Sequence, residues 1–101
     1  MKYKVVVSSA AHQDIAHALM YYLNLNRELS EKLLAAIDGA YAKIESTPEA
    51  YSFYGNSKTL RRYLLKSFPY CFVYQVKIED IFILGFHHIR QNPEAIFKRS
   101  E

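Results

Sequence analysis

The sequence predicts an α+β fold with the order β-α-α-β-β-β, in which a helical hairpin packs on one face of a small antiparallel sheet. A short β-branched run near the N-terminus is followed by two apolar stripes at helical spacing. Three runs rich in β-branched and aromatic residues then follow closely in the C-terminal half. At 101 residues, the chain is expected to form a single domain over residues 1–101.

The N-terminal part predicts one strand and the start of a helix. Tyr3–Val7 is the expected strand, because it is a β-branched run. Ser8 or Ser9 then caps the first helix, with Asp14 in its first turns. Spacings of three and four place one apolar stripe on a single helical face, which comprises Ile15, Ala18, Leu19, Tyr22 and Leu23.

A second helix follows after a short polar break. The stretch NLNR at 24–27 interrupts the apolar pattern, and Ser30 is expected to cap the new helix. Thr47–Pro48 ends it, because the residue before a proline is pushed out of the α region. We therefore expect an antiparallel α-hairpin. The second apolar stripe comprises Leu33, Leu34, Ile37, Ala40, Tyr41 and Ile44.

The second half of the chain predicts a loop and an antiparallel meander. Residues 49–59 read as a loop, and the strands are expected at 60–66, 70–77 and 80–88. Their short connections favour hairpins. The last two strands are apolar on both parities, which is typical of central strands covered on both faces. Gly85 inside the last strand indicates a bulge or a close approach.

Composition and charge exclude several classes of protein. The net charge of +3 and the pI of about 9.0 permit a phosphate-bearing partner without requiring one. The longest apolar stretch, at 81–86, is far too short to span a bilayer, so no membrane association is expected. The start MKYKVVV lacks a signal-type apolar region and the single Cys71 cannot form an internal disulfide, so we expect a cytoplasmic protein.

A metal site is not expected. Neighbouring strand residues point to opposite faces, so His87 and His88 cannot readily share an ion. His12 and His17 miss the spacing of four at which helical histidines bind zinc together. Cys71, in mid-strand between aromatic residues, is expected to be buried and inert.

The cations of the first C-terminal strand allow two interpretations. Arg62 and Lys66 share one parity and Arg61 the other, so one arginine must face away from the helices. Cations and an imidazole beside tyrosines could bind phosphate and carry out metal-independent acid–base chemistry on RNA. Alternatively, Arg62 and Lys66 form a solvated face, and the histidines are hydrogen-bonded at a strand end. On the next strand, one face comprises Tyr70, Phe72, Tyr74 and Val76.

Four stretches occur together in an order that resembles a known family. They are S-x-A-x-x-D-I from Ser9, I-x-S-T-P from Ile44, LRRYLLKSFPYCFVYQV from Leu60, and FHHIRQNP from Phe86. This set is similar to the RelE/ParE superfamily of toxins from bacterial type II toxin–antitoxin modules, and it covers nearly the whole chain. The last stretch resembles the terminal His-x-x-Arg-x-Pro signature of ParE-like members.

The resemblance implies a small toxin that a cognate antitoxin neutralises by wrapping around it with a helix and an extended segment. We expect the antitoxin on the open face of the sheet or beside the helical hairpin. RelE-like members cut mRNA at the ribosome without a metal, whereas ParE-like members are not nucleases and poison DNA gyrase. No cofactor is implied by either branch.

Departures from the RelE-like pattern favour the ParE-like branch. Cys71 stands where RelE-like enzymes commonly carry an arginine, and no tyrosine follows Arg90. Phe97 lies near the position of the usual C-terminal tyrosine, but a phenyl ring transfers no proton. We therefore expect a protein-binding inhibitor of gyrase, not an enzyme, that binds through Arg61, Arg62, Lys66 and Arg90. If the chain is a RelE-like nuclease, its catalytic candidates are Lys66, His87, His88 and Arg90.

Overall fold

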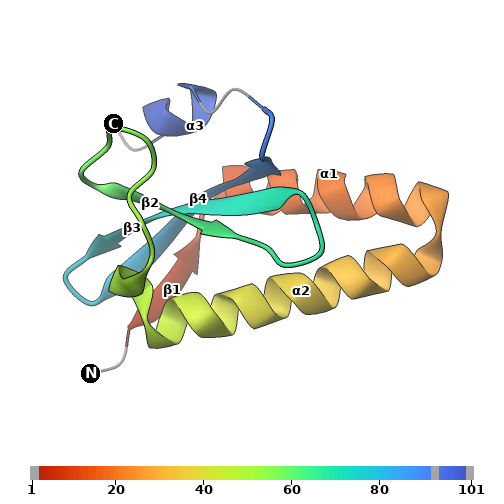
Figure 1. Cartoon of the computed structure of the whole chain (residues 1–101), viewed down its shortest axis with the longest axis horizontal. Coiled ribbons are helices and arrows are strands. Elements are labelled where there is room, and N and C mark those ends of the chain that lie inside the picture. The colour runs from red at the N-terminus through yellow and green to blue at the C-terminus, as the bar shows by residue number, and fades with distance from the viewer. Residues whose placement is uncertain (1–2, 92–93, 100–101) are drawn as a thin grey trace.

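The computed structural model describes residues 3–91 and 94–99 and shows the predicted elements followed by a short terminal helix (Figure 1). The α+β class and the β-α-α-β-β-β order are confirmed, whereas the terminal helix was not predicted. The elements are β1 (Lys4–Val7), α1 (Ser9–Leu25), α2 (Arg27–Ser46), the 3₁₀ turn η1 (Pro48–Ala50), β2 (Leu60–Leu64), β3 (Tyr70–Lys77), β4 (Asp80–His88) and α3 (Glu94–Lys98).

The sheet has four strands in the order β1-β4-β3-β2. β2, β3 and β4 form the predicted antiparallel meander. β1 joins the far edge parallel to β4, with Val5 opposite Ile81. A parallel neighbour is possible because the whole helical hairpin lies between β1 and the meander in the chain. β4 and β3 are therefore the central strands, as their apolar composition predicted.

The helical hairpin has almost no connecting loop. Ser8 caps α1 as predicted, because its Oγ accepts a hydrogen bond from Ala11 N at 3.0 Å. The predicted cap at Ser30 is wrong: Asn26 caps α2 through Oδ1, which accepts from Glu28 N at 2.7 Å. Ser30 lies inside α2, and its hydroxyl donates to Leu19 O at 3.1 Å, which links the two helices. None of the helices in the described part of the chain is long and apolar enough to cross a membrane.

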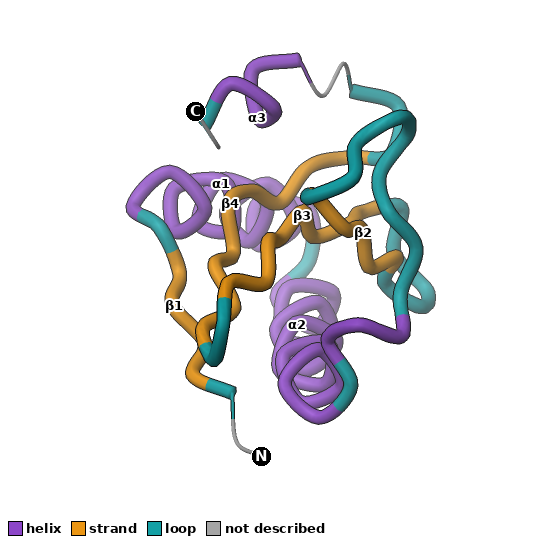
Figure 2. The backbone as a smooth tube through the Cα atoms, turned by 90° about the vertical axis from the view of Figure 1, so that its left-hand side faces the viewer, coloured by secondary structure: helices purple, strands orange, loops and turns teal. Residues whose placement is uncertain are grey.

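Two apolar clusters lie on opposite faces of the sheet. The face that contacts α1 and α2, here the hairpin face, carries the larger core, with Leu33 and Ile37 from α2 against Phe72 and Tyr74 from β3. The opposite face, here the outer face, carries a small cluster of Leu60, Val73 and Ile96. Figure 2 shows α2 and α3 on opposite sides of the sheet. The predicted single face of Tyr70, Phe72, Tyr74 and Val76 is confirmed as part of the hairpin-face core.

A β-bulge in β4 changes which side chains face the helices. Val73 lies opposite Gly85 and Tyr74 opposite Ile83, so Leu84 is an extra residue without a partner in the ladder. Ile83 and Phe86 consequently both belong to the hairpin-face core, although they differ in parity. Leu84 packs in the outer-face cluster. The bulge predicted from Gly85 is confirmed.

Gly85 also permits a close approach by α3. A Cβ added at Gly85 would lie 2.7 Å from Ile96 Cδ1 and 3.0 Å from Arg99 Nη1. Ile96 is buried, so its side chain cannot simply turn into solvent. The absence of a side chain at Gly85 thus allows α3 to dock on the outer face.

Gly85→Ala should destabilise the protein by about 1–3 kcal/mol, because the added methyl overpacks a filled contact. Urea unfolding measures the loss, and NMR shifts should change mainly in α3. The control is Gly39→Ala in α2, where, apart from the neighbouring backbone of the helix itself, no atom lies within 4 Å of the added Cβ. That change should stabilise by about 0.5–1 kcal/mol. Equal stability of Gly85→Ala and the unmodified chain would contradict the close approach.

The turn between β3 and β4 holds a strained residue. Ile78 has a φ of 56° and is 94% exposed. β-branched residues rarely adopt this left-handed conformation, which costs about 1–2 kcal/mol. Ile78→Gly should therefore raise the free energy of unfolding by about 1 kcal/mol in urea titrations. Glu79→Gly is the matched control and should give no gain, because among described non-glycine residues only Ser67 and Ile78 have positive φ.

Candidate functional site

The two adjacent arginines of β2 have different surroundings. Arg61 tethers the segment after η1, because its Nη1 donates to Tyr51 O at 2.6 Å and to Glu49 O at 3.2 Å. Its guanidinium also lies 4.1 Å from the centre of the Phe53 ring. Arg62 lies on the same face of β2 as Leu60, which is the outer face. Its guanidinium carbon lies 4.9 Å from the centre of the Tyr54 ring, in the same segment as Phe53. The prediction that one arginine faces away from the helices is confirmed for Arg62.

His87 is the buried histidine of the pair, with an exposed fraction of 4%. Its ring stacks on Tyr54 with the ring centres 5.9 Å apart. Nε2 lies 3.3 Å from Tyr54 Oη and 3.3 Å from Cys71 Sγ, and Nδ1 lies 2.7 Å from His88 O. Because a carbonyl only accepts, Nδ1 carries the proton and Nε2 accepts from the hydroxyl or the thiol.

Burial keeps this cluster uncharged. It lowers the pKa of His87, and the neighbouring Arg62 lowers it further, although the bond to the His88 backbone raises it. Burial raises the pKa of the Cys71 thiol to about 11 and also raises the pKa of Tyr54. The predicted burial of Cys71 is confirmed. Imidazole, thiol and phenol are thus neutral at pH 7, and the thiol and the phenol both contact His87 Nε2. This arrangement suits a packed core better than proton transfer to a substrate.

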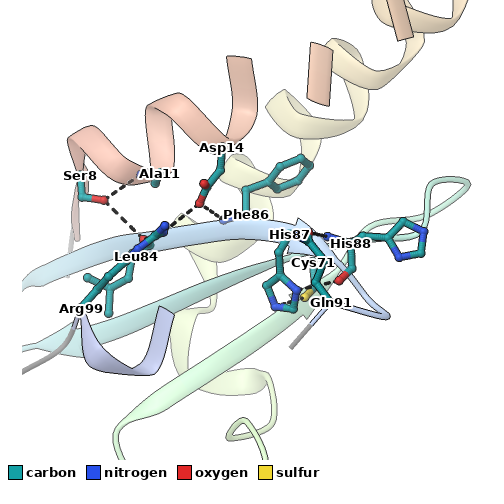
Figure 3. A network of polar contacts seen from close by, with 10 residues as sticks. All are labelled: Ser8, Ala11, Asp14, Cys71, Leu84, Phe86, His87, His88, Gln91 and Arg99. Carbon is teal, nitrogen blue, oxygen red and sulfur yellow. Dashed lines mark hydrogen bonds and ion pairs between the residues drawn. The ribbon is translucent and has the colours of Figure 1, made fainter. Parts of the chain in front are cut away.

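His88 organises the turn that follows β4. Its ring meets Tyr70 edge-on at 5.5 Å, and its Nδ1 accepts from Arg90 N at 3.1 Å. Its own N–H donates to Gln91 Oε1 at 2.9 Å. Figure 3 shows the rings of His87 and His88 pointing in different directions, as strand alternation predicted. The Asn92–Pro93 end of the predicted terminal signature lies outside the described residues.

Two of the predicted cations meet at one pocket. Arg62 and Lys66 line an open pocket of about 480 Å³, together with Lys43 from α2, which the sequence did not single out. Arg61 and Arg90 do not line it. Lys66 lies beyond the end of β2 and not inside the strand as predicted, because β2 ends at Leu64 and Ser67 adopts a φ of 71°.

A polar network holds α3 across the outer face (Figure 3). Arg99 donates to Asp14 Oδ2 at 2.8 Å and to Leu84 O at 2.8 Å. Asp14 also accepts from Phe86 N at 3.2 Å, while the hydroxyl of Ser8 lies 3.5 Å from Leu84 O. The carbonyl of the bulge residue Leu84 thus accepts from Arg99 and lies near the hydroxyl of Ser8, so it joins segments from both halves of the chain.

Tyr54 is the residue of this region that sequence reasoning missed. The ring of Phe97 meets Tyr54 edge-on at 5.1 Å, so Phe97 covers the cluster from α3. Phe97 thus packs against a tyrosine and does not replace one. The tyrosine lies in a segment assigned only as a loop, and its repeated aromatic residues were the available signal. Within residues 3–91 and 94–99, no group of three or more His, Cys, Asp or Glu side chains could hold a metal ion.

One solved structure has a closely similar fold. The chain matches a chain of the chromosomal ParDE TA system from P. aeruginosa with a TM-score of 0.74 and 17% sequence identity. The match covers 85% of this chain and 95% of that chain. The resemblance to RelE/ParE toxins is thereby confirmed at the level of the fold. No protein-family model and no curated protein matches the sequence.

The lowered pKa of His87 predicts a pH dependence of stability. Well above the ordinary pKa of 6.5, the ring is neutral in both the folded and the unfolded states, so His87 does not lower the free energy of unfolding. As the pH falls below 6.5, the unfolded state takes up a proton before the folded state does, so stability is lost until the lowered pKa is reached.

His87→Phe keeps a ring against Tyr54 but removes the titration, so it should flatten this part of the curve. Urea unfolding of both proteins from pH 8 to pH 5 measures the effect. Above pH 7, the difference between their free energies of unfolding should be constant, which is an internal control. Parallel curves over the whole range would show that His87 is not kept neutral by the fold.

Proposed function

We propose that this chain is the toxin of a type II toxin–antitoxin module and that it acts by binding a cellular target protein, DNA gyrase, without catalysis. The proposal includes a cognate antitoxin that neutralises it, a cytoplasmic location, a single domain, and no cofactor. The fold shared with a chain of a ParDE system supports the module type. Gyrase is the target that the resemblance to ParE-like members implies, and the site bears on the choice between binding and RNA cleavage.

The observation that favours inhibition by binding over RNA cleavage is the burial of His87. A metal-independent nuclease needs a group that exchanges protons with the RNA, within hydrogen-bond reach of it. His87 has both ring nitrogens engaged and is 4% exposed beneath Tyr54. Phe97, which the resemblance puts near the usual C-terminal tyrosine, has a phenyl ring that packs on Tyr54 and offers no proton. These features favour inhibition by binding.

One feature keeps a RelE-like ribosome-dependent mRNA endonuclease as the alternative. Arg62 and Lys66 meet at an open pocket with a third cation, which is a suitable arrangement for a phosphate backbone. His88, which is partly exposed beside the backbone of Arg90, is then the remaining acid–base candidate. The two functions make opposite predictions for mRNA.

Expression of the chain in cells without an antitoxin should stop growth, while ribosome-bound mRNA stays intact. The purified chain should block DNA supercoiling by purified gyrase. Primer extension on mRNA from the same cells provides the second measurement. Codon-specific cuts that disappear in Lys66→Ala, His88→Ala and Arg90→Ala would establish the nuclease instead. His87→Phe is the matched control, because it changes a histidine that does not reach solvent. Normal supercoiling with intact mRNA would contradict both functions.

A further inference from the structure

The outer edge of β2 is paired along only part of its length. The segment 52–54 lies antiparallel to the first half of β2: Tyr54 N donates to Leu60 O at 2.7 Å, and Arg62 N donates to Ser52 O at 3.0 Å. Before Ser52 the chain turns away into η1, so this short ladder stops at Arg62. Figure 1 shows this segment, in green, crossing from the end of α2 toward β2.

Beyond Arg62 the edge is open. Hydrogen bonds alternate sides along an antiparallel strand, and residues 60 and 62 bond outward, so Leu64 also presents its N–H outward. Among the described residues, nothing bonds to Arg62 O or to Leu64 N, and the open pocket lies at this position. A free donor and acceptor at the edge of a sheet are a template for another strand.

Three cations surround this open edge. Arg62 has the outer-face parity and Lys66 follows the strand, while Lys43 comes from α2 on the hairpin side. No Asp or Glu lines the pocket, and none of the three forms an ion pair within residues 3–91 and 94–99. Positive charge therefore accumulates where an added strand would place side chains on both of its faces.

We propose that the edge of β2 at Arg62–Leu64 binds an extended acidic peptide segment of a partner protein by strand addition. The peptide backbone bonds to Leu64 N–H and Arg62 C=O, and its carboxylates pair with Lys43, Arg62 and Lys66. The inference rests on the proposed function, because the antitoxin is the partner that would supply such a segment. It places that contact at the edge of β2 and states that the bound segment is acidic.

The surroundings favour a peptide over single-stranded RNA. RNA binding of this kind uses exposed aromatic rings on which bases stack. The two tyrosines at the pocket, Tyr51 and Tyr63, instead pack edge-to-face on each other at 4.9 Å, and Tyr63 is buried. A phosphate oxygen can accept from the edge amide but has no donor for the edge carbonyl, whereas a peptide satisfies both.

The test is an NMR titration of the full chain at low salt with a short peptide that places glutamates on both faces of an extended strand. Shifts should centre on residues 62–66, and the Leu64 amide should become protected from hydrogen exchange. A peptide with glutamine in place of glutamate should bind about tenfold more weakly, because the charge pairing is lost.

Two pairs of variants test the charge pairing and the backbone hydrogen bond separately. Lys66→Glu should weaken binding of the glutamate peptide by at least about tenfold, whereas Lys77→Glu, the same charge change at the far end of β3, should not. Leu64→Pro removes only the outward N–H and should abolish binding, while Leu64→Ala should keep it.

Three results would overturn the proposal: no shifts at residues 62–66, equal binding of the two peptides, or binding of oligouridylate but not of the glutamate peptide at these residues. The titration involves neither gyrase nor toxicity. Its failure would therefore leave the supercoiling result standing, and a negative supercoiling result would leave the edge assignment standing.

Discussion

The arrangement of this protein depends on one extra residue in its central strand. Leu84 interrupts the ladder between β3 and β4, and the interruption lets Ile83 and Phe86 face the same helices. Without it, strict alternation would place His87 on the hairpin face with Ile81 and Ile83. The carbonyl of this bulge residue accepts a hydrogen bond from Arg99 at 2.8 Å. The position of α3 is thus tied to the register of the sheet.

This constraint determines the chemistry available on the outer face. His87 turns away from the large core, but loop and α3 side chains close over it and keep it neutral. Three cations, Lys43, Arg62 and Lys66, lie instead around an open pocket at the edge of β2. The exposed features therefore suit recognition of a partner by charge and backbone, and the proton-carrying groups of the cluster serve packing.

Much of the fold followed from the sequence because its signals are local. Apolar periodicity predicted both helices, and short connections predicted the meander. The misplaced cap shows the limit of such signals: Ser30 has a suitable cap sequence, but Asn26 can close both helices, and tertiary contact uses the Ser30 hydroxyl elsewhere. The parallel pairing of β1 is set by the path of the hairpin and has no local signature.

The candidate site was less predictable, because its contacts join distant segments. The pairing of the His87 ring with Tyr54 spans 33 positions, and that of Arg99 with Asp14 spans 85. No spacing rule in one sequence relates residues so far apart. Strand parity correctly separated the two arginines and the two histidines, but it could not say which face the loop and α3 would cover.

The single-residue junction at Asn26 has a consequence for how such a chain can change in length. The residue ends one helix and begins the next, donating to Tyr22 O and accepting from Glu28 N. Adding or deleting one residue within either helix would rotate its apolar stripe by about 100° relative to the other helix. We therefore expect changes in length to be tolerated at places such as residues 55–59, where the chain leaves the sheet and no helix phase has to be preserved.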